Sequence, residues 1–285
     1  MGASMSHHQS LVDLAKQSLS RFSPIPAGVS PDLNRLHGVK CVVFDVYGTL
    51  LLSDRSPAAG DRNAALREIL ESLEITCEHE KPASAFHSLL QKKAFSARLS
   101  GASSPEFDVR KLWKRVLGES VSDQNIEKVA LAYECAMHRV WLAPNVKSVL
   151  SQLSALGLPL GILSNAQFYT PILLEALLGM PLSEFGFMDT LSFYSYECGE
   201  SKPGPLMFDQ LVGRLERLHL RPNETLIVGN DLNNDIAPAQ ERDFKTLLVA
   251  QDERSLTMDS DGGSLGDPIE PNATITSFDD LFQII

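Results

Sequence analysis

The sequence predicts an α/β protein, with a doubly wound parallel, Rossmann-like sheet core and an inserted bundle of α-helices as a cap. Two observations support this fold class. Short apolar runs, typical of buried parallel strands, alternate along the chain with segments of helical periodicity. After the first run, about ninety residues have helical periodicity throughout, which indicates an insertion. Strands are expected at 42–45, 158–163, 190–193, 225–228 and 246–249.

The insertion divides the chain into three expected parts. Residues 1–38 form an amphipathic helix and a proline-containing linker, with a solvated end at His7 and His8. Residues 39–53 and 143–285 form the core, and residues 54–142 form the cap. Four apolar helical faces are expected in the cap region, and they lie at 66–73, 86–95, 112–117 and 129–140. A bundle at this place is a natural lid that excludes water from a site below it.

Composition limits the possible partners. The formal net charge of −11 argues against nucleic acid and anionic membranes, because both attract clustered Lys and Arg. The four cysteines are far apart and form no CxxC pair, so reduced thiols are expected. No apolar run approaches the ~20 residues of a membrane span, and the N-terminus lacks the pattern of a signal peptide. A cytoplasmic protein with a small anionic substrate is expected.

The first strand of the core ends on a carboxylate. Asp45 follows the apolar run 42–44, and ligands of parallel sheets bind beyond the carboxyl ends of the strands. Gly48 gives the backbone freedom for a tight turn, and Thr49 adds a hydroxyl group. A carboxylate in this position can attack an electrophile and form a covalent intermediate. The alternative is that Asp45 only caps the next turn.

Polar groups also stand at the corresponding ends of the later elements. They are Ser164-Asn165 after one strand, Lys202 at a helix start, and Asn230-Asp231 with Asp235 after another strand. Each has a structural alternative: a helix cap, a solvated lysine or an Asx-rich turn. Their common order along the chain favours one shared site.

This arrangement resembles the haloacid dehalogenase superfamily. The matching motifs are 45–50 (DVYGTL), Ser164-Asn165, Lys202-Pro203 and 229–235 (GNDLNND), and the helical insertion corresponds to that superfamily's cap. The resemblance covers residues 39 to about 250. It implies an aspartyl-enzyme intermediate at Asp45 and hydrolysis of a small substrate under the cap.

The resemblance also implies a role for each matched residue. Lys202 would keep the Asp45 carboxylate ionised. Ser164, with Asn165 and the adjoining backbone N–H groups, would donate to substrate oxygens. Asp235 would orient Lys202 or a water molecule.

The motifs differ from both main branches of the superfamily. The phosphatases carry a second Asp two residues after the nucleophile as general acid, and this chain has Tyr47 there, whose phenol with a reference pKa of ~10 is a poor acid. The 2-haloacid dehalogenases carry Tyr at that position, because a halide leaves without a proton, and they also carry Ser-Asn in the second motif. Both matches favour dehalogenation.

Other positions depart from the dehalogenase pattern. That branch has Tyr where this chain has Phe208, Ser at Asn230 and Asn at Leu232. Three candidates exist for its cap arginine, which grips the substrate carboxylate: Arg55, Arg62 and Arg98. The phosphatase branch would have Asp in place of Asn230 as a metal ligand.

Charge favours a metal. If Asp45, Asp231 and Asp235 face Lys202 in one pocket, two negative charges remain, and Mg²⁺ would neutralise them. The expected ligands are Asp45, the Tyr47 carbonyl, and Asn230 or Asp231. The predicted function is therefore a hydrolase with an aspartyl nucleophile, Mg²⁺-dependent phosphatase chemistry being favoured over metal-independent 2-haloacid dehalogenation. A degenerate member that binds a metabolite without turnover is the third alternative.

Overall fold

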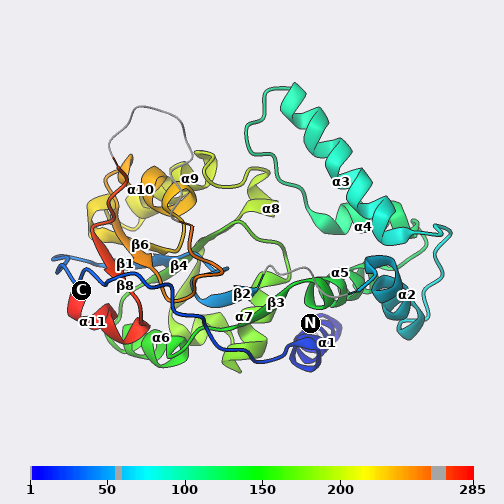
Figure 1. The fold of residues 1–285 in the computed structure, drawn as a ribbon, viewed down its shortest axis with the longest axis horizontal. Helices are drawn as coiled ribbons and strands as arrows, with labels where there is room; N and C mark the ends of the chain where they lie inside the picture. The colour runs from blue at the N-terminus through cyan, green and yellow to red at the C-terminus, as the bar shows by residue number, and fades with distance from the viewer. Residues whose placement is uncertain (1, 55–59, 258–267) are drawn as a thin grey trace.

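The structure is a computed structural model that describes residues 2–54, 60–257 and 268–285 of the chain. Its main sheet has six parallel strands in the order β5-β4-β1-β6-β7-β8 (Figure 1). Their bounds are β1 Cys41–Phe44, β4 Leu160–Ser164, β5 Phe187–Tyr194, β6 Thr225–Gly229, β7 Lys245–Val249 and β8 Ala273–Ile275. Strand β1 lies between β4 and β6, where the winding reverses, and this switch point is where open α/β sheets bind ligands.

The side chains of alternate residues of β1 point to opposite faces of the sheet. Val42 and Phe44 contribute to the larger apolar core, whereas Cys41 and Val43 contribute to a second core on the opposite face. All four side chains are fully buried. The doubly wound arrangement is therefore confirmed, because both faces of a parallel sheet must be covered by helices.

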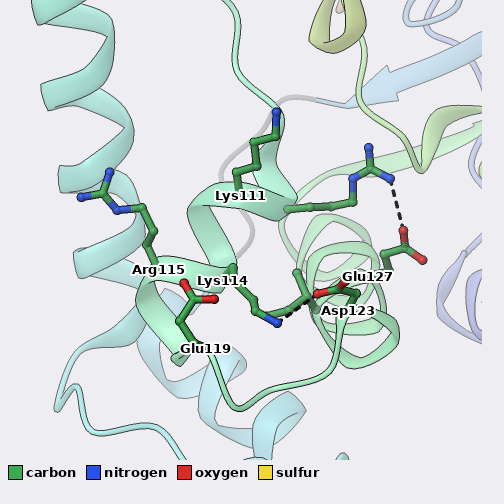
Figure 2. A pocket seen from close by; sticks show the side chains of 8 residues that line it. Lys111, Lys114, Arg115, Glu119, Asp123 and Glu127 are labelled. Atoms are coloured by element: carbon green, nitrogen blue, oxygen red, sulfur yellow. Dashed lines mark hydrogen bonds and ion pairs between the residues drawn. The ribbon is translucent and has the colours of Figure 1, made fainter.

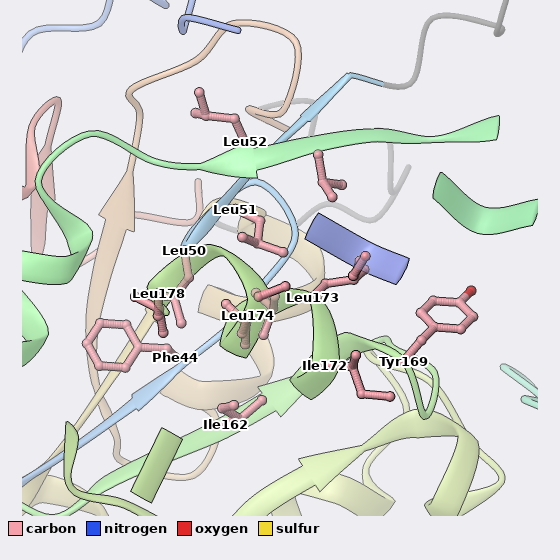
Figure 3. Packing of buried hydrophobic residues seen from close by; sticks show 14 of the residues in the cluster. Phe44, Leu50, Leu51, Leu52, Ile162, Tyr169, Ile172, Leu173, Leu174 and Leu178 are labelled. Atoms are coloured by element: carbon pink, nitrogen blue, oxygen red, sulfur yellow. The ribbon is translucent and has the colours of Figure 1, made fainter. Parts of the chain in front are cut away.

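Helices from both halves of the chain cover these faces. Figure 3 shows α7 packing its leucines into the same cluster as Phe44 and Ile162. On the other face, Phe208 and Leu211 of α9 pack with Val43. The bounds of the core helices are α6 Val146–Ala155, α7 Thr170–Leu178, α8 Ser195–Cys198, α9 Leu206–Arg217, α10 Ala237–Gln240 and α11 Leu281–Ile284. Short irregular turns complete the core: η1 Leu182–Phe185, η2 Pro222–Glu224, η3 Leu232–Ile236 and η4 Phe278–Asp280.

In the described part of the insertion after β1, four helices are found, as expected, and they extend to one side of the sheet (Figure 1). We call them the cap helices: α2 Arg62–Ser72, α3 Pro82–Leu99, α4 Val109–Leu117 and α5 Asp123–Met137. Aromatic side chains join them, since Phe86 of α3 stacks on Trp113 of α4 at 4.0 Å between ring centroids. Tyr133 of α5 meets Trp113 edge-on at 5.2 Å. These rings belong to the same buried cluster as Phe44 of β1, so the apolar core continues from the sheet into the cap helices.

An antiparallel ribbon at the base of the cap helices was not predicted. Strand β2 (Leu51–Asp54) pairs with β3 (Arg139–Leu142). Val140, expected on the fourth cap helix, lies in β3, because α5 ends at Met137. Strand β8 was also missed, because its three residues follow a long polar stretch and give too short a signal.

The N-terminal helix α1 (Gly2–Ser18) contacts both the cap and the core. It packs on α5 and α7. His7 pairs with Glu127 at 2.8 Å, and His8 pairs with Glu175 at 2.8 Å. The expectation of a solvated end at these histidines was wrong, because the helix continues through them and lies against the body of the protein.

The four cysteines are free thiols, and two of them, Cys41 and Cys135, are buried. None of the described helices combines the length and the apolar character that crossing a bilayer requires.

Candidate active site

Asp45 lies at the carboxyl edge of the sheet, immediately after β1. Its backbone N–H still donates to the Val228 carbonyl of β6 at 2.8 Å, so the residue is held by the sheet. Its side chain is 9% exposed. The apolar strand thus delivers a nearly buried carboxylate to the switch point.

The Lys202 ammonium group lies between two carboxylates. Its Nζ donates to Oδ1 of Asp45 at 2.8 Å and to Oδ1 of Asp235 at 2.5 Å. A third donation goes to the Leu163 carbonyl at the end of β4, at 2.7 Å. All three protons of the amine are therefore used, and only 3% of the lysine side chain is exposed.

Burial and charge shift the pKa values of this cluster. Burial alone would lower the pKa of Lys202, but the nearby charges of Asp235 and Asp45 outweigh it and raise the pKa. The amine is thus a permanent cation. Burial raises the pKa of Asp235 from 3.8 to about 7, against the opposing effect of Lys202. The charge of the cluster consequently depends on pH near neutrality.

Asn165 fixes the backbone of Lys202. Its Oδ1 accepts from the Lys202 backbone N–H at 2.6 Å, and its Nδ2 donates to the Lys202 carbonyl at 3.0 Å. The two bonds join the end of β4 to the loop before α9. In this geometry the Asn165 side chain positions the lysine.

Ser164 contacts the nucleophile candidate directly. Its Oγ donates to Oδ1 of Asp45 at 3.0 Å, so the hydroxyl group is directed at the carboxylate. Oδ1 thereby receives two hydrogen bonds. Among the described residues nothing donates to the other oxygen, Oδ2, which leaves it open for attack on a substrate.

The hydroxyl group of Tyr47 is engaged by a neighbouring residue, and its pKa is raised. Its phenol oxygen bonds to Oγ1 of Thr170 at 2.8 Å, and its ring stacks on His138 at 5.6 Å between centroids. Burial and the nearby charge of Glu134 raise the pKa of Tyr47 well above the ordinary value of 10. The phenol is therefore unsuited to protonating a leaving group at neutral pH.

The side chains of Thr49 and Asn230 form a hydrogen bond with each other, next to the turn that follows Asp45. The Thr49 hydroxyl, expected near Asp45, instead donates to Oδ1 of Asn230 at 3.1 Å. The Asn230 amide donates in turn to the Ser255 carbonyl. Gly48, with φ +94°, passes so close that a Cβ there would lie 2.4 Å from Nδ2 of Asn230. The glycine is thus required both by conformation and by space.

Asp235 and Asp231 organise the loop after β6. Oδ2 of Asp235 accepts from the backbone N–H groups of Asn230 and Asp231, both at 3.1 Å. The Asp231 carboxylate caps the following turn, accepting from the backbone N–H groups of Asn233 and Asn234. The Asn234 side-chain amide adds a third bond to Asp231 at 2.8 Å.

Two adjoining cavities open above these groups. The inner cavity, of about 60 Å³, is lined by Asp45, Tyr47, Asn165, Lys202, Asn230 and Asp235, among others. The outer cavity, of about 220 Å³, shares Tyr47 and Asn165 with it and adds Glu106, Glu134, His138 and Gln167. Because cap residues line the outer cavity, a small molecule bound there would lie between the cap and the nucleophile candidate.

The donor set fits a hydrated magnesium ion better than a fully protein-bound metal. The described residues contain no cluster of three or more His, Cys, Asp and Glu side chains that could hold a metal. Magnesium requires less, because it keeps several waters and uses one or two carboxylates with substrate oxygens. Oδ2 of Asp45 suits that mode, and Asp45 lines the inner cavity. Asn230 and Asp231 line it too, but both are already engaged, because the Asn230 amide oxygen accepts from Thr49 and the Asp231 carboxylate caps its own turn.

A separate hollow of about 490 Å³, lined mainly by charged residues, lies on α4 and α5 of the cap (Figure 2). It shares no lining residue with the inner and outer cavities. Two of its cations are paired, Lys114 with Asp123 at 3.0 Å and Arg110 with Glu127 at 3.2 Å. We therefore place the chemistry at Asp45, despite the larger size of this hollow.

Comparison with known families decides the class of the chain. The family model of haloacid dehalogenase-like hydrolases matches residues 39–241, which is most of the chain. The chain is a haloacid dehalogenase-like hydrolase. The resemblance predicted from the four motifs is therefore confirmed, and the protein is a hydrolase.

Curated relatives of this hydrolase are phosphatases. A ribulose-1,5-bisphosphate 5-phosphatase of Halopiger xanaduensis is 29% identical over 218 residues, covering 75% of this chain and 86% of the relative. A phosphoglycolate phosphatase of Escherichia coli is 27% identical and covers 89% and 95%. Among solved structures, a 2-haloacid dehalogenase from Pseudomonas syringae superposes with a TM-score of 0.52 at 22% identity, covering 86% of this chain and 97% of that one. The structural match supports the fold.

Neither of the two described candidate arginines of this hydrolase lines the inner or the outer cavity. Arg55 falls outside the described residues. Arg62 lines a third, mainly apolar cavity inside the cap, and Arg98 lies on the last turn of α3. Phe208 is buried in the core under α9 and does not reach the site.

Sequence reasoning missed the residues of the outer cavity. Glu134 accepts from the Tyr169 phenol at 2.8 Å and pairs with His138 at 3.0 Å. Glu106 accepts from the Ser195 hydroxyl at 3.1 Å and from Gln167 at 3.3 Å. The spacing of Glu134 and His138, four residues apart at a helix end, was the available signal.

Proposed function

We propose that this hydrolase cleaves small phosphate monoesters through a covalent aspartyl-phosphate at Asp45. The contact of the buried Lys202 amine with Oδ1 of Asp45 supports this proposal, because Oδ2 then receives no hydrogen bond from any described residue, and Asp45 lines the inner cavity. Lys202 is a permanent cation, so it places a positive charge against the Asp45 carboxylate. The phosphatase names of the curated relatives agree with this reaction class.

The reaction has two displacements at phosphorus. Oδ2 of Asp45 attacks, the bond from phosphorus to the ester oxygen breaks, and the alcohol leaves with the electron pair and takes a proton from water. A water molecule then attacks the phosphorus of the aspartyl-phosphate. The bond from phosphorus to Oδ2 breaks, phosphate leaves, and the proton of the attacking water passes to solvent.

Charge in the inner cavity favours a divalent cation during this reaction. With Asp235 ionised, the cluster of Asp45, Lys202 and Asp235 carries one net negative charge, which repels a phosphate dianion. Magnesium bound by Asp45, the Tyr47 carbonyl and Asn230 would offset that repulsion and polarise the phosphoryl oxygens. Lys202 would contribute on the other side, by holding Oδ1 of Asp45 in place.

Metal-independent 2-haloacid dehalogenation is the second candidate. It is favoured by Tyr47, whose hydroxyl is bonded to Thr170 and cannot act as an acid, because a halide leaves without a proton. The negative outer cavity opposes it, since a haloacid carries a carboxylate that Glu106 and Glu134 would repel.

Two substrate panels separate these reactions. Phosphate monoesters, with p-nitrophenyl phosphate as the reference, and 2-haloacids are each assayed with Mg²⁺ and with EDTA. We expect Mg²⁺-dependent phosphate release that Asp45→Asn abolishes, while Asp189→Asn on the exposed core surface keeps it. Halide release in EDTA would replace the proposal with the second candidate. No turnover on either panel, with phosphate still binding, would indicate the degenerate alternative.

A further inference from the structure

The outer cavity carries negative charge beside the nucleophile candidate. Glu106 and Glu134 both line it, and none of the described residues that line it is Lys or Arg. With both glutamates ionised and His138 neutral, the lining side chains sum to −2, although burial raises the pKa of Glu106 above its ordinary value. A bound molecule therefore meets an anionic wall on the side away from Lys202.

Each carboxylate is held in place by hydrogen bonds from protein groups. Glu106, from the loop before α4, accepts from the Ser195 hydroxyl and the Gln167 amide. The Phe107 backbone N–H adds a bond at 2.9 Å. Glu134 is fixed by the Tyr169 phenol and by His138. Since both ends of each contact are built into the cap and core, these groups are preorganised for a ligand.

The shared lining fixes where a substrate would lie. Tyr47 and Asn165 line both cavities, so a molecule whose reacting group sits at Asp45 extends toward the two glutamates. The outer cavity of about 220 Å³ has room for a few non-hydrogen atoms beyond the reacting group. A second anionic group on the substrate would face two carboxylates at short range.

We propose that this hydrolase selects phosphate esters whose alcohol part carries an ammonium group, and that Glu106 and Glu134 are the selecting residues. The inference rests on the proposed phosphatase function. It departs from the substrates that the names of the curated relatives state, since phosphoglycolate and ribulose bisphosphate each carry a second anionic group. An ammonium group supplies three donors to the glutamate oxygens, and a carboxylate supplies none.

Three esters that differ only in the terminal group test this selection. They are 2-aminoethyl phosphate, 2-hydroxyethyl phosphate and 2-phosphoglycolate, each with its three-carbon homologue. For the wild type, kcat/KM is measured for each ester. For the Asp45→Asn variant, calorimetry measures the affinity of each ester, so that the selection can be compared without hydrolysis. The expected order is ammonium, then hydroxyl, then carboxylate, with about tenfold or more between the first and the last.

Glutamine variants assign the selection to the two residues. Glu106→Gln and Glu134→Gln keep the size and most of the hydrogen bonds, and each is expected to reduce the ammonium-to-carboxylate ratio severalfold. Glu119→Gln, on the exposed surface of the cap, removes the same charge at a distance and should leave the ratio unchanged. Arg62 is not a matched control, because the third cavity that it lines shares Glu134 and Tyr169 with the outer one.

The outcomes separate this inference from the function on which it rests. Preference for phosphoglycolate, or a preference for ammonium that survives both glutamine substitutions, overturns the selection. Loss of phosphoglycolate binding in Arg62→Gln would overturn it too, by showing that the distal group passes into the third cavity. If p-nitrophenyl phosphate is not hydrolysed, the proposed function fails, and the calorimetric order on Asp45→Asn still decides the selection.

Discussion

The Nζ atom of Lys202 lies 2.8 Å from Oδ1 of Asp45, although 157 residues separate them and both side chains are almost fully buried. The same amine contacts Asp235, so one cation stabilises two buried carboxylates. Removing one member of such a group leaves an unpaired buried charge, which costs more than the group contributes as a whole.

Replacing Lys202 by Met should destabilise the fold and abolish hydrolysis. Two buried carboxylates would lose their countercharge, with an expected cost of about 3–5 kcal/mol in the free energy of unfolding. Part of that stability should return on acidification, when the carboxylates become protonated. Urea denaturation at a series of pH values measures this. Stability that is independent of pH and equal to that of the wild type would contradict the ion-pair account, and Lys147→Met on the surface of α6 is the control.

The contribution of Asp235 to the free energy of unfolding should decrease as the pH rises. Its pKa is raised from 3.8 to about 7 by burial, with Lys202 opposing and Asp45 adding to the shift. In the unfolded chain the group loses its proton near pH 4, whereas the folded protein keeps it up to about pH 7. Between those values the folded state binds more protons, so the free energy of unfolding falls as the pH rises and levels off above pH 7.

The comparison with Asp235→Asn isolates this term. The difference in the free energy of unfolding between wild type and variant should decline from pH 4 to pH 7, by at most a few kcal/mol at ~1.4 kcal/mol per pKa unit. A difference that rises over this interval would show that Asp235 is ionised in the folded protein throughout.

Hydrolysis should depend steeply on the leaving group. Since the hydroxyl of Tyr47 is bonded to Thr170 and its pKa is raised, it supplies no proton to the departing alcohol. General acid catalysis contributes about 10²–10⁴-fold where it operates. Aryl phosphates should therefore exceed alkyl phosphates in kcat by about that factor, as a series of esters of graded alcohol pKa would measure. Equal rates along the series would reveal an acid that the geometry does not show.

Gly48→Ala should destabilise the protein more than Gly28→Ala does. Both glycines have positive φ, at +94° and +68°, so both substitutions incur the cost of that conformation. A Cβ at Gly48 would also lie 2.4 Å from the Asn230 amide, while Gly28 has open space. We expect an additional loss of about 1–3 kcal/mol at Gly48. Thermal unfolding of the two variants measures it, and equal losses would contradict the role of the Asn230 contact.

Much of the site could be predicted because its residues end regular elements. Asp45, Ser164 and Asn230 each follow an apolar strand, and parallel strands bring their carboxyl ends to one edge. The helical insertion could be predicted for a different reason, because its apolar residues recur with a strong helical period. The domain boundaries and the catalytic roles remain predictions.

What could not be predicted depends on contacts between distant segments. The Thr49 hydroxyl turns to Asn230 rather than Asp45, because the loop after β1 folds back tightly at Gly48. At the outer cavity, Gln167 of the core donates a hydrogen bond to Glu106 of the insertion, 61 residues earlier in the chain. No local sequence pattern predicts a contact between residues so far apart. Strand β2 was not predicted, since its partner β3 lies on the far side of the insertion.

Mass spectrometry of the peptide that contains Asp45, after a single turnover of p-nitrophenyl phosphate in H₂¹⁸O and an acid quench, tests the central claim most directly. The proposed reaction predicts a phosphoryl group on Asp45 at early times, with ¹⁸O appearing in the released phosphate and not in the peptide. An ¹⁸O label in Asp45 would indicate water attack at an ester carbon, as in dehalogenation. Turnover with neither a phosphoryl group nor label on Asp45, or turnover retained by Asp45→Asn, would contradict the assignment of Asp45 as the nucleophile.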